Sequence, residues 1–138
     1  MSSRLNPYLS FDGNAREAMQ FYGGVFGSEP ALSTYGEYGD PSAPGAEKIM
    51  HATLETSGGY TLMAADNPPG TPYTPGNTMS ISLSGDEEDA LRRYWGGLSD
   101  GGTVVVPLDK QMWGDTFGMC TDRFGVTWMV NIGQPQAT

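Results

Sequence analysis

The chain contains an internal repeat, and this feature constrains its fold more than any other. Residues 10–26 align with residues 82–98 without a gap, so the two segments lie 72 positions apart. The identical pairs of this alignment are Ser10/Ser82, Gly13/Gly85, Ala18/Ala90, Tyr22/Tyr94 and Gly24/Gly96. A second, shorter match aligns residues 59–63 with residues 125–129 at a spacing of 66. Because the two matches occur in the same order, we expect a duplicated module.

Each copy has a helix pattern after its first strand. In the first copy, Asn14 is the expected N-cap and Glu17 follows three residues later, as in a capping box. Apolar residues then recur at helical spacing through residues 15–26, which predicts one buried stripe. Gly27 is a good residue to end this helix in a left-handed conformation. In the second copy, Asp86 takes the place of the N-cap.

Strand-like segments complete each copy as strand–helix–strand–strand–strand. They lie at about 5–11, 31–38, 48–56 and 59–65 in the first copy, and at about 77–83, 102–106, 112–121 and 125–132 in the second. We therefore predict an α+β fold in which one domain, residues 1–138, consists of two tandem βαβββ modules at about 5–66 and 77–133. The linker is 67–76, and its segment Pro68–Gly76 is rich in proline and glycine.

Strand alternation sorts the side chains into two faces. The apolar sets expected beneath the helices are Pro7, Leu9 and Phe11; Met50, Ala52 and Leu54; Met79, Ile81 and Leu83; and Trp128, Val130 and Ile132. The opposite face then carries polar or mixed side chains, among them Tyr8, His51, Thr53, Met63, Ser80, Met129 and Asn131. This second face is either an ordinary solvated sheet face or the lining of a ligand cup.

Charge and cysteine content exclude several classes of function. The chain has 16 Asp and Glu against 7 Lys and Arg, a formal charge of −9. Nucleic acids and anionic membranes attract basic proteins, so neither is an expected partner. The single cysteine, Cys120, excludes an intrachain disulfide and a cysteine-rich zinc site. No apolar stretch approaches the length of a membrane span, and we expect a cytoplasmic protein.

Several motifs together resemble the glyoxalase/bleomycin resistance/extradiol dioxygenase (vicinal oxygen chelate) superfamily. They include Asn6-Pro7-Tyr8-Leu9, Gly13-Asn14-Ala15, Phe21-Tyr22, His51-Ala52-Thr53-Leu54, Trp113-Gly114, Phe117-Gly118 and Asp122-Arg123-Phe124-Gly125-Val126 with Trp128. The resemblance is greatest to the PhnB-like branch, often labelled 3-demethylubiquinone 3-methyltransferase. It implies an open eight-stranded sheet cup around a small ligand, and a homodimer. No glycine-rich strand–loop–helix motif for an adenosyl cofactor is present, which argues against methyl transfer.

The resemblance also implies where a metal would bind. Metal enzymes of the superfamily carry His or Glu at four strand positions, two in each module. The matching positions here hold Met63 and Met129 in the last strands, and Asn6/Tyr8 and Thr78/Ser80 in the first strands. None of these is a good ligand for a divalent metal, so we expect no metal and no other cofactor.

Four further candidates for a functional role each have a plainer alternative. His51, the only histidine, is suited to acid–base work or is a hydrogen-bonded strand residue. Cys120 is a nucleophile if His51 lies beside it, and otherwise a buried thiol. Asp122-Arg123 binds an anionic ligand or makes an ion pair or turn contact. Trp113 is an aromatic wall or a core residue.

The sequence therefore predicts a protein that binds a small organic molecule in its sheet cup without the usual metal chelate. The expected ligand-binding residues are Tyr8, His51, Met63, Ser80, Trp113, Met129 and Asn131. The alternative is an enzyme of lyase, isomerase, dioxygenase or transferase type that uses His51 as an acid–base group or has an atypical metal site.

Overall fold

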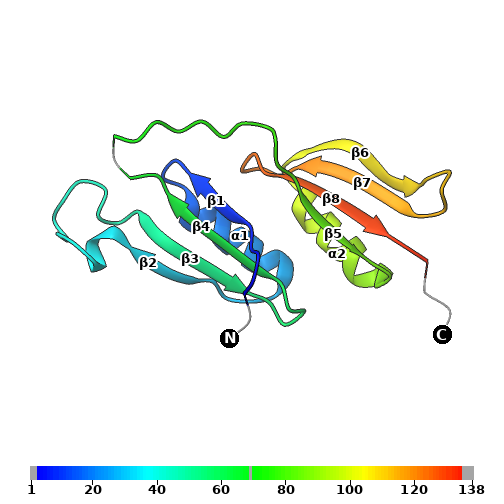
Figure 1. Ribbon diagram of the computed structural model, residues 1–138, viewed down its shortest axis with the longest axis horizontal. Helices are drawn as coiled ribbons and strands as arrows, with labels where there is room; N and C mark the ends of the chain where they lie inside the picture. The colour runs from blue at the N-terminus through cyan, green and yellow to red at the C-terminus, as the bar shows by residue number, and fades with distance from the viewer. Residues whose placement is uncertain (1–2, 69, 135–138) are drawn as a thin grey trace. The chain divides into compact units, whose positions relative to one another are not determined.

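The computed structural model describes residues 3–68 and 70–134. Its elements follow the order strand–helix–strand–strand–strand twice, which confirms the expected α+β fold (Figure 1). The strands form two four-stranded sheets. The chain divides into two compact units, Met1–Pro75 and Gly76–Thr138. The joining of the two sheets into one cup stays a prediction.

The first unit contains a mixed sheet with strand order β1-β4-β3-β2. Its elements are β1 (Tyr8–Phe11), α1 (Ala15–Phe26), β2 (Ala31–Thr34), the 3₁₀ turn η1 (Tyr35–Glu37), β3 (Ile49–Glu55) and β4 (Thr61–Asp66). β1 runs parallel to β4, and the other pairs are antiparallel. α1 packs against β3 and β4, which leaves the opposite side of the sheet without a helix from this unit.

The second unit repeats this topology with strand order β5-β8-β7-β6. Its elements are β5 (Ile81–Gly85), α2 (Glu88–Ser99), β6 (Thr103–Lys110), β7 (Thr116–Thr121) and β8 (Thr127–Ile132). β5 is parallel to β8, as β1 is to β4. α2 packs on β5, β7 and β8. In each unit, the sheet side opposite to its helix is called the far face below.

The apolar stripe of α1 is confirmed, and Asn14 stands at the N-cap position, but the expected side-chain cap is wrong. Asn14 makes no capping hydrogen bond with its side chain. The carboxylate of Asp66, at the end of β4, accepts instead from the backbone N–H groups of Gly13 and Ala15, each at 2.9 Å. An acceptor from a neighbouring strand satisfies these groups as well as a local one does. Gly27 ends the helix as expected, with φ at 75°.

The second helix also begins differently from the expectation. It starts at Glu88, after Glu87, and has no side-chain capping bond. Asp86 contributes only its backbone carbonyl, which accepts from the N–H of Glu88 at 2.9 Å. At the spacing of 72, β5 ends two positions later than β1 and α2 begins one position later than α1, so Glu87 stands at the N-cap in place of Asp86.

Most of the expected core positions are buried beneath the helices. The confirmed members are Phe11, Ala52, Leu54, Leu83, Trp128, Val130 and Ile132. Two others lie before their strands begin and are exposed, Pro7 and Met79. Met50 is only half-buried, and Ile49 takes the buried position instead. The pairing of β2 with β3 shifts register at Ser33, and such an irregularity interrupts the alternation of faces.

The spacing of the repeat differs between its elements. In the helices, the buried pair Met19/Leu91 keeps the spacing of 72. In the parallel strands, Tyr8 lies beside Met63 whereas Ser82 lies beside Met129, a spacing of 74. Ser82 therefore occupies the place in the second sheet that Tyr8 occupies in the first.

Candidate functional site

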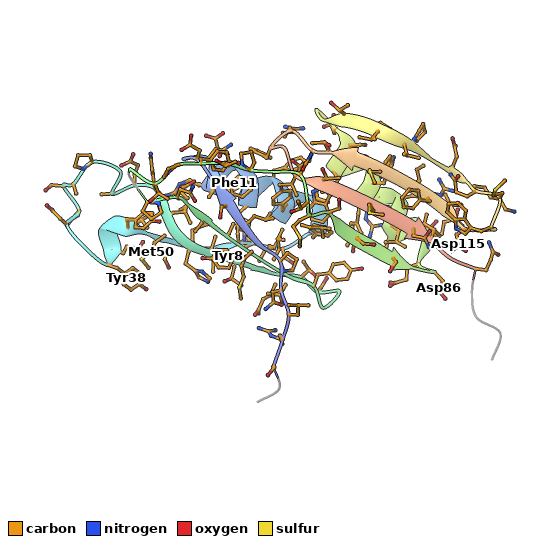
Figure 2. The ribbon with its side chains drawn as sticks, turned by 45° about the horizontal axis from the view of Figure 1, so that its top comes forward. Tyr8, Phe11, Tyr38, Met50, Asp86 and Asp115 are labelled. Carbon is orange, nitrogen blue, oxygen red and sulfur yellow. The ribbon has the colours of Figure 1, made fainter. Side chains whose placement is uncertain are left out.

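A hydrogen-bonded chain of three side chains crosses the far face of the first sheet. The Tyr8 hydroxyl lies 3.1 Å from Nδ1 of His51, and Nε2 of His51 lies 2.9 Å from the Thr53 hydroxyl. The Tyr8 and His51 rings are also in contact, with centroids 5.7 Å apart. Tyr8 is half exposed at this edge of the sheet (Figure 2).

Strand register brings these residues together. Tyr8 on β1 pairs with Met63 on β4, and Met63 pairs with Thr53 on β3. His51 precedes Thr53 by two residues, so it points to the same face. The Tyr8 side chain therefore reaches across β4 to the histidine on the next strand. Met63 lies beneath this bridge as an adaptable apolar side chain.

Both ring nitrogens of His51 lie within hydrogen-bond distance of a hydroxyl group, so neither nitrogen is left to contact a ligand directly. A neutral imidazole donates from one nitrogen and accepts at the other, and a hydroxyl can fill either role. One consistent arrangement has the Tyr8 O–H donating to Nδ1 while Nε2–H donates to Thr53. The polar atom that this chain presents to a ligand is then the phenolic oxygen of Tyr8, with His51 behind it.

A second tyrosine lies near this chain. The Tyr35 hydroxyl donates to the backbone carbonyl of Asp66 at 2.6 Å. Burial raises the pKa of Tyr35, and the negative charge of Asp66 and the proximity of Tyr8 raise it further. Tyr35 is therefore a neutral phenol at physiological pH and adds no charge beside Tyr8.

The far face of the second sheet is different in character. Phe117 and Met119 stand 66 positions after His51 and Thr53, so apolar side chains occupy the places of these two polar residues. At one end, the side-chain amide of Asn131 donates to Asp115 at 3.0 Å. The rings of Trp113 and Phe117 lie beside this pair, with their centroids 6.3 Å apart.

The residues expected to line one site thus fall into two groups. Tyr8, His51 and Met63 meet on the first sheet. Met129 and Asn131 belong to the second sheet, and Trp113 lies on the hairpin at its end. Ser80 precedes β5, and Ser82 holds the position facing Met129.

Two further polar residues near these groups were absent from the expected site, Thr53 and Asp115. The signal for each was simple alternation, since each lies two positions from a residue on the far face.

The donor atoms at the ligand positions that the resemblance implies do not fit a divalent metal. The first sheet offers the thioether of Met63 and the phenol of Tyr8, where imidazole or carboxylate would be needed. Within residues 3–68 and 70–134, no group of three or more His, Cys, Asp or Glu side chains could hold a metal ion. No chemical step at this face is therefore assigned to a metal.

Cys120 and Asp122 have structural surroundings. Cys120 is fully buried, and burial, followed by the charge of Asp122, raises the pKa of its thiol to about 11. Asp122 is buried in the turn before β8, where it accepts hydrogen bonds from two backbone N–H groups and the Trp128 indole. Arg123 pairs with Asp100 at 3.2 Å. These contacts match the plainer alternatives for all three residues.

Comparison with known proteins identifies the family. The model of the family described as 3-demethylubiquinone-9 3-methyltransferase matches residues 3–131, and the chain belongs to this family. The protein YjdN of Escherichia coli is 30% identical to it, over 97% of this chain and 98% of YjdN.

Solved structures agree with this assignment. Protein PA1353 of Pseudomonas aeruginosa is 42% identical, with a TM-score of 0.85 over 97% of this chain and all of that one. A PhnB protein of Bacillus cereus, described as a putative 3-demethylubiquinone-9 3-methyltransferase, is 27% identical, with a TM-score of 0.70 over 95% of this chain and all of that one. A glyoxylase/bleomycin resistance protein/dioxygenase domain of Frankia shares the fold at 14% identity, with a TM-score of 0.67 over 97% and 99% of the two chains. The expected PhnB-like family and the expected fold are confirmed.

Neither helix has the roughly 20 apolar residues that a membrane crossing needs. Each is 12 residues long, and no helix in the described part of the chain is a candidate span.

Proposed function

We propose that the protein binds a small organic molecule on the far face of the first sheet, without a metal chelate. The observation that carries this proposal is the chain Tyr8–His51–Thr53, in which side chains from two strands, β1 and β3, form one hydrogen-bonded unit ending at a half-exposed phenol. A ligand oxygen or nitrogen would exchange a hydrogen bond with Tyr8. Apolar parts of the ligand would rest on Met63 and on Ala65, which is next on the same face.

Preorganisation supports this role for Tyr8. A mobile surface tyrosine loses side-chain entropy when it orders around a ligand. Here the ring contact and the hydrogen bond to His51 hold the phenol before a ligand arrives. Thr53 in turn holds His51 through its other nitrogen, so it acts as a positioning residue.

A catalytic role is the second candidate, and the Tyr8–His51 hydrogen bond favours it. The phenolic oxygen can accept a proton from a bound molecule while its own proton passes to Nδ1 of His51. This step balances without a metal or a redox cofactor. It gives His51 an acid–base role through Tyr8, in place of direct contact with the substrate.

Methyl transfer, which the family description names, has less support from this chain. An adenosyl cofactor on a nucleotide-binding fold places anionic or polar groups at a free helix N-terminus. The N-terminus of α1 already receives the Asp66 carboxylate, which fills that position with a negative charge.

Titration with catechol tests the binding proposal. Catechol is a small aromatic probe with two hydrogen-bonding oxygens, and the family description names a quinone. We expect saturable NMR shifts centred on Tyr8, His51 and Met63, and at least about a fivefold loss of affinity in Tyr8→Phe, since one hydrogen bond contributes about 1 kcal/mol. Tyr38→Phe is the matched control, because Tyr38 is 70% exposed and lies in the turn after η1. Equal affinity in both variants would remove Tyr8 from the site.

Metal analysis tests the absence of a chelate. Protein purified without chelator should contain well under one equivalent of zinc, nickel, manganese or iron. One metal per chain that is lost in His51→Ala would replace this proposal with the atypical metal site.

The proposed assembly is a homodimer in the cytoplasm. Val104 and Val105, on the edge strand β6, are 47% and 55% exposed, and exposed apolar edges are sites of association. Sedimentation equilibrium at micromolar concentration should give twice the chain mass of 14.8 kDa. A single species at the chain mass would contradict the dimer.

A further inference from the structure

The hairpin between β6 and β7 holds an aromatic pair at the surface. Trp113 is 60% exposed although its side chain is large and hydrophobic. Its ring is not free, because it leans on Phe117 at the start of β7. Exposed aromatic pairs of this kind are typical of surfaces that receive another apolar or aromatic group.

An amide and a carboxylate lie directly beside this pair. Asn131 faces Phe117 across the β7–β8 pairing, and Asp115 precedes Phe117 by two residues, so all three share the far face. One hydrogen bond, from Asn131 Nδ2 to Asp115 Oδ2, fixes both polar groups. Within residues 3–68 and 70–134, neither side chain makes a second hydrogen bond, which leaves the Oδ1 atom of each as an acceptor.

The charges around this site have one sign. Asp109 on β6 pairs with Phe117 from the other side, so a second carboxylate borders the ring. The neighbouring base, Lys110, pairs with Thr116 and so belongs to the opposite face. The chain as a whole carries a formal charge of −9. An anionic ligand is disfavoured here, and a cation is favoured by the carboxylates and by the faces of the two rings.

We propose that Trp113, Phe117, Asp115 and Asn131 form a binding site for an organic cation, a primary ammonium attached to an aromatic or apolar body. The ammonium donates its N–H groups to the oxygens of Asp115 and Asn131. The body of the ligand packs on Trp113 and Phe117. All four residues belong to the second unit, so this site can be tested independently of the Tyr8–His51 site.

Three probes of one shape test the charge requirement. They are 2-phenylethylammonium chloride, the neutral 2-phenylethanol and the anionic phenylacetate, each titrated into ¹⁵N-labelled full-length protein. The ammonium should give saturable shifts of the Trp113 indole and the Asn131 side-chain amide, with a Kd of about 1 mM, typical for a ligand of this size. 2-Phenylethanol should bind at least about tenfold more weakly, because it lacks the charge. Phenylacetate should not saturate.

Two variants test the residues themselves. Asp115→Asn keeps a partner for Asn131 but removes the charge, and should weaken ammonium binding about tenfold. Trp113→Ala, at an exposed hairpin tip, should weaken it about three- to tenfold. Asp89→Asn, an exposed acid on α2, is the matched control and should stay within about twofold of the parent.

Three outcomes would overturn the proposal. They are equal affinity for 2-phenylethanol and the ammonium, Asp115→Asn within twofold of the parent protein, and shifts centred away from the hairpin. A folded ¹H–¹⁵N spectrum for each variant separates lost binding from lost structure. A response at Tyr8 without one at Trp113 would also reject this site, while it supported the separate site on the first sheet.

Discussion

The two units have the same topology, and each has a buried aspartate near its last strand. In the first unit this aspartate ends the strand, and in the second unit it lies in the turn before the strand. β4 and β8 align at a spacing of 66, with Asp66 and Ile132 at the same final position. Asp66 is 2% exposed and accepts from three backbone N–H groups, those of Gly13, Ala15 and Ile49. At the other end of the strand, before it begins, the second unit has the buried Asp122.

The turn before the last strand has the same side-chain-to-backbone hydrogen bond in both units, but a different residue makes it. Thr56 and Asp122 are equivalent, and each accepts a hydrogen bond from the backbone N–H four residues later. Asp122 also accepts from the Trp128 indole at 2.8 Å, a donor that the first unit lacks because Leu62 stands there. In each unit, the buried carboxylate therefore lies where N–H groups of that unit need an acceptor.

The largest effect is expected from Asp66→Ala. It leaves three backbone donors without their acceptor, and should lower the free energy of unfolding by about 3–5 kcal/mol in denaturant titrations. Asp12→Ala, an exposed acid just before the helix, should change it by less than about 0.5 kcal/mol.

Replacing Asp66 with the residue that the second unit has at the equivalent position gives a more specific test. Asp66→Ile gives the first unit the residue of β8, and should be as destabilising as alanine despite its larger apolar surface. Stability restored to that of the parent protein would mean that the carboxylate is dispensable and that the comparison between the units is wrong.

The next largest effect on the free energy of unfolding is expected from replacing Asp122. Asp122→Thr introduces the residue of the first unit, keeps an acceptor for the turn and removes the acceptor of the Trp128 indole. Unfolding should become easier by about 1–3 kcal/mol. Trp128→Phe, added to Asp122→Thr, removes the indole N–H that has lost its acceptor. The two substitutions should therefore show a coupling energy of about 1 kcal/mol in a double-mutant cycle. Purely additive changes would argue against the indole bond.

Helix–sheet packing gives a third test. Trp95 on α2 and the backbone of Leu108 on β6 both crowd Gly118, where an added Cβ would lie 2.8 Å from the Trp95 ring and 2.9 Å from the Leu108 Cα. The first unit has Gly23 in place of Trp95 and Ala52 in place of Gly118. Gly118→Ala should therefore cost about 1–3 kcal/mol by overpacking. The cost should shrink in part when Trp95→Ala is present, and the remainder is the contact with the Leu108 backbone.

A matched glycine provides the control for this test. Gly96, on the same helix, has open space where its Cβ would be. Gly96→Ala should stabilise the protein by about 0.5–1 kcal/mol, because it is helical and unhindered. Destabilisation by Gly96→Ala would show that α2 tolerates no added methyl group, and would remove Trp95 as the specific cause.

The smallest effect is expected at Cys120, which replaces Leu54 of the first unit. Its thiol pKa of about 11 lies above neutral pH, so the protonated form dominates and the side chain behaves as a small apolar group. A thiol reagent such as DTNB should not react with the folded protein at pH 7.5, and should react fully in guanidinium. Rapid reaction in the folded state would contradict its burial.

Local sequence patterns predicted the elements well. The stripe of α1, its glycine end and the burial of Trp128, Val130 and Ile132 all follow from periodicity and turn chemistry. The pattern placed Asn14 at the N-cap position but missed the acceptor, because the carboxylate of Asp66, 51 residues beyond Ala15, takes the place of the Asn14 side chain. The residue that faces Met129, Ser82, was not among the expected ligand-binding residues, because the helices and the parallel strands follow different spacings.

The sequence by itself determined that the chain is two copies of one βαβββ module and which side chains face away from the helices. Only the tertiary structure decided which of those side chains meet. Tyr8 and His51 lie 43 residues apart, and Asp66 and Ala15 lie 51 apart. Periodicity reports on neighbours along one element, whereas the register of a parallel pair and the reach of a buried carboxylate depend on how distant segments pack.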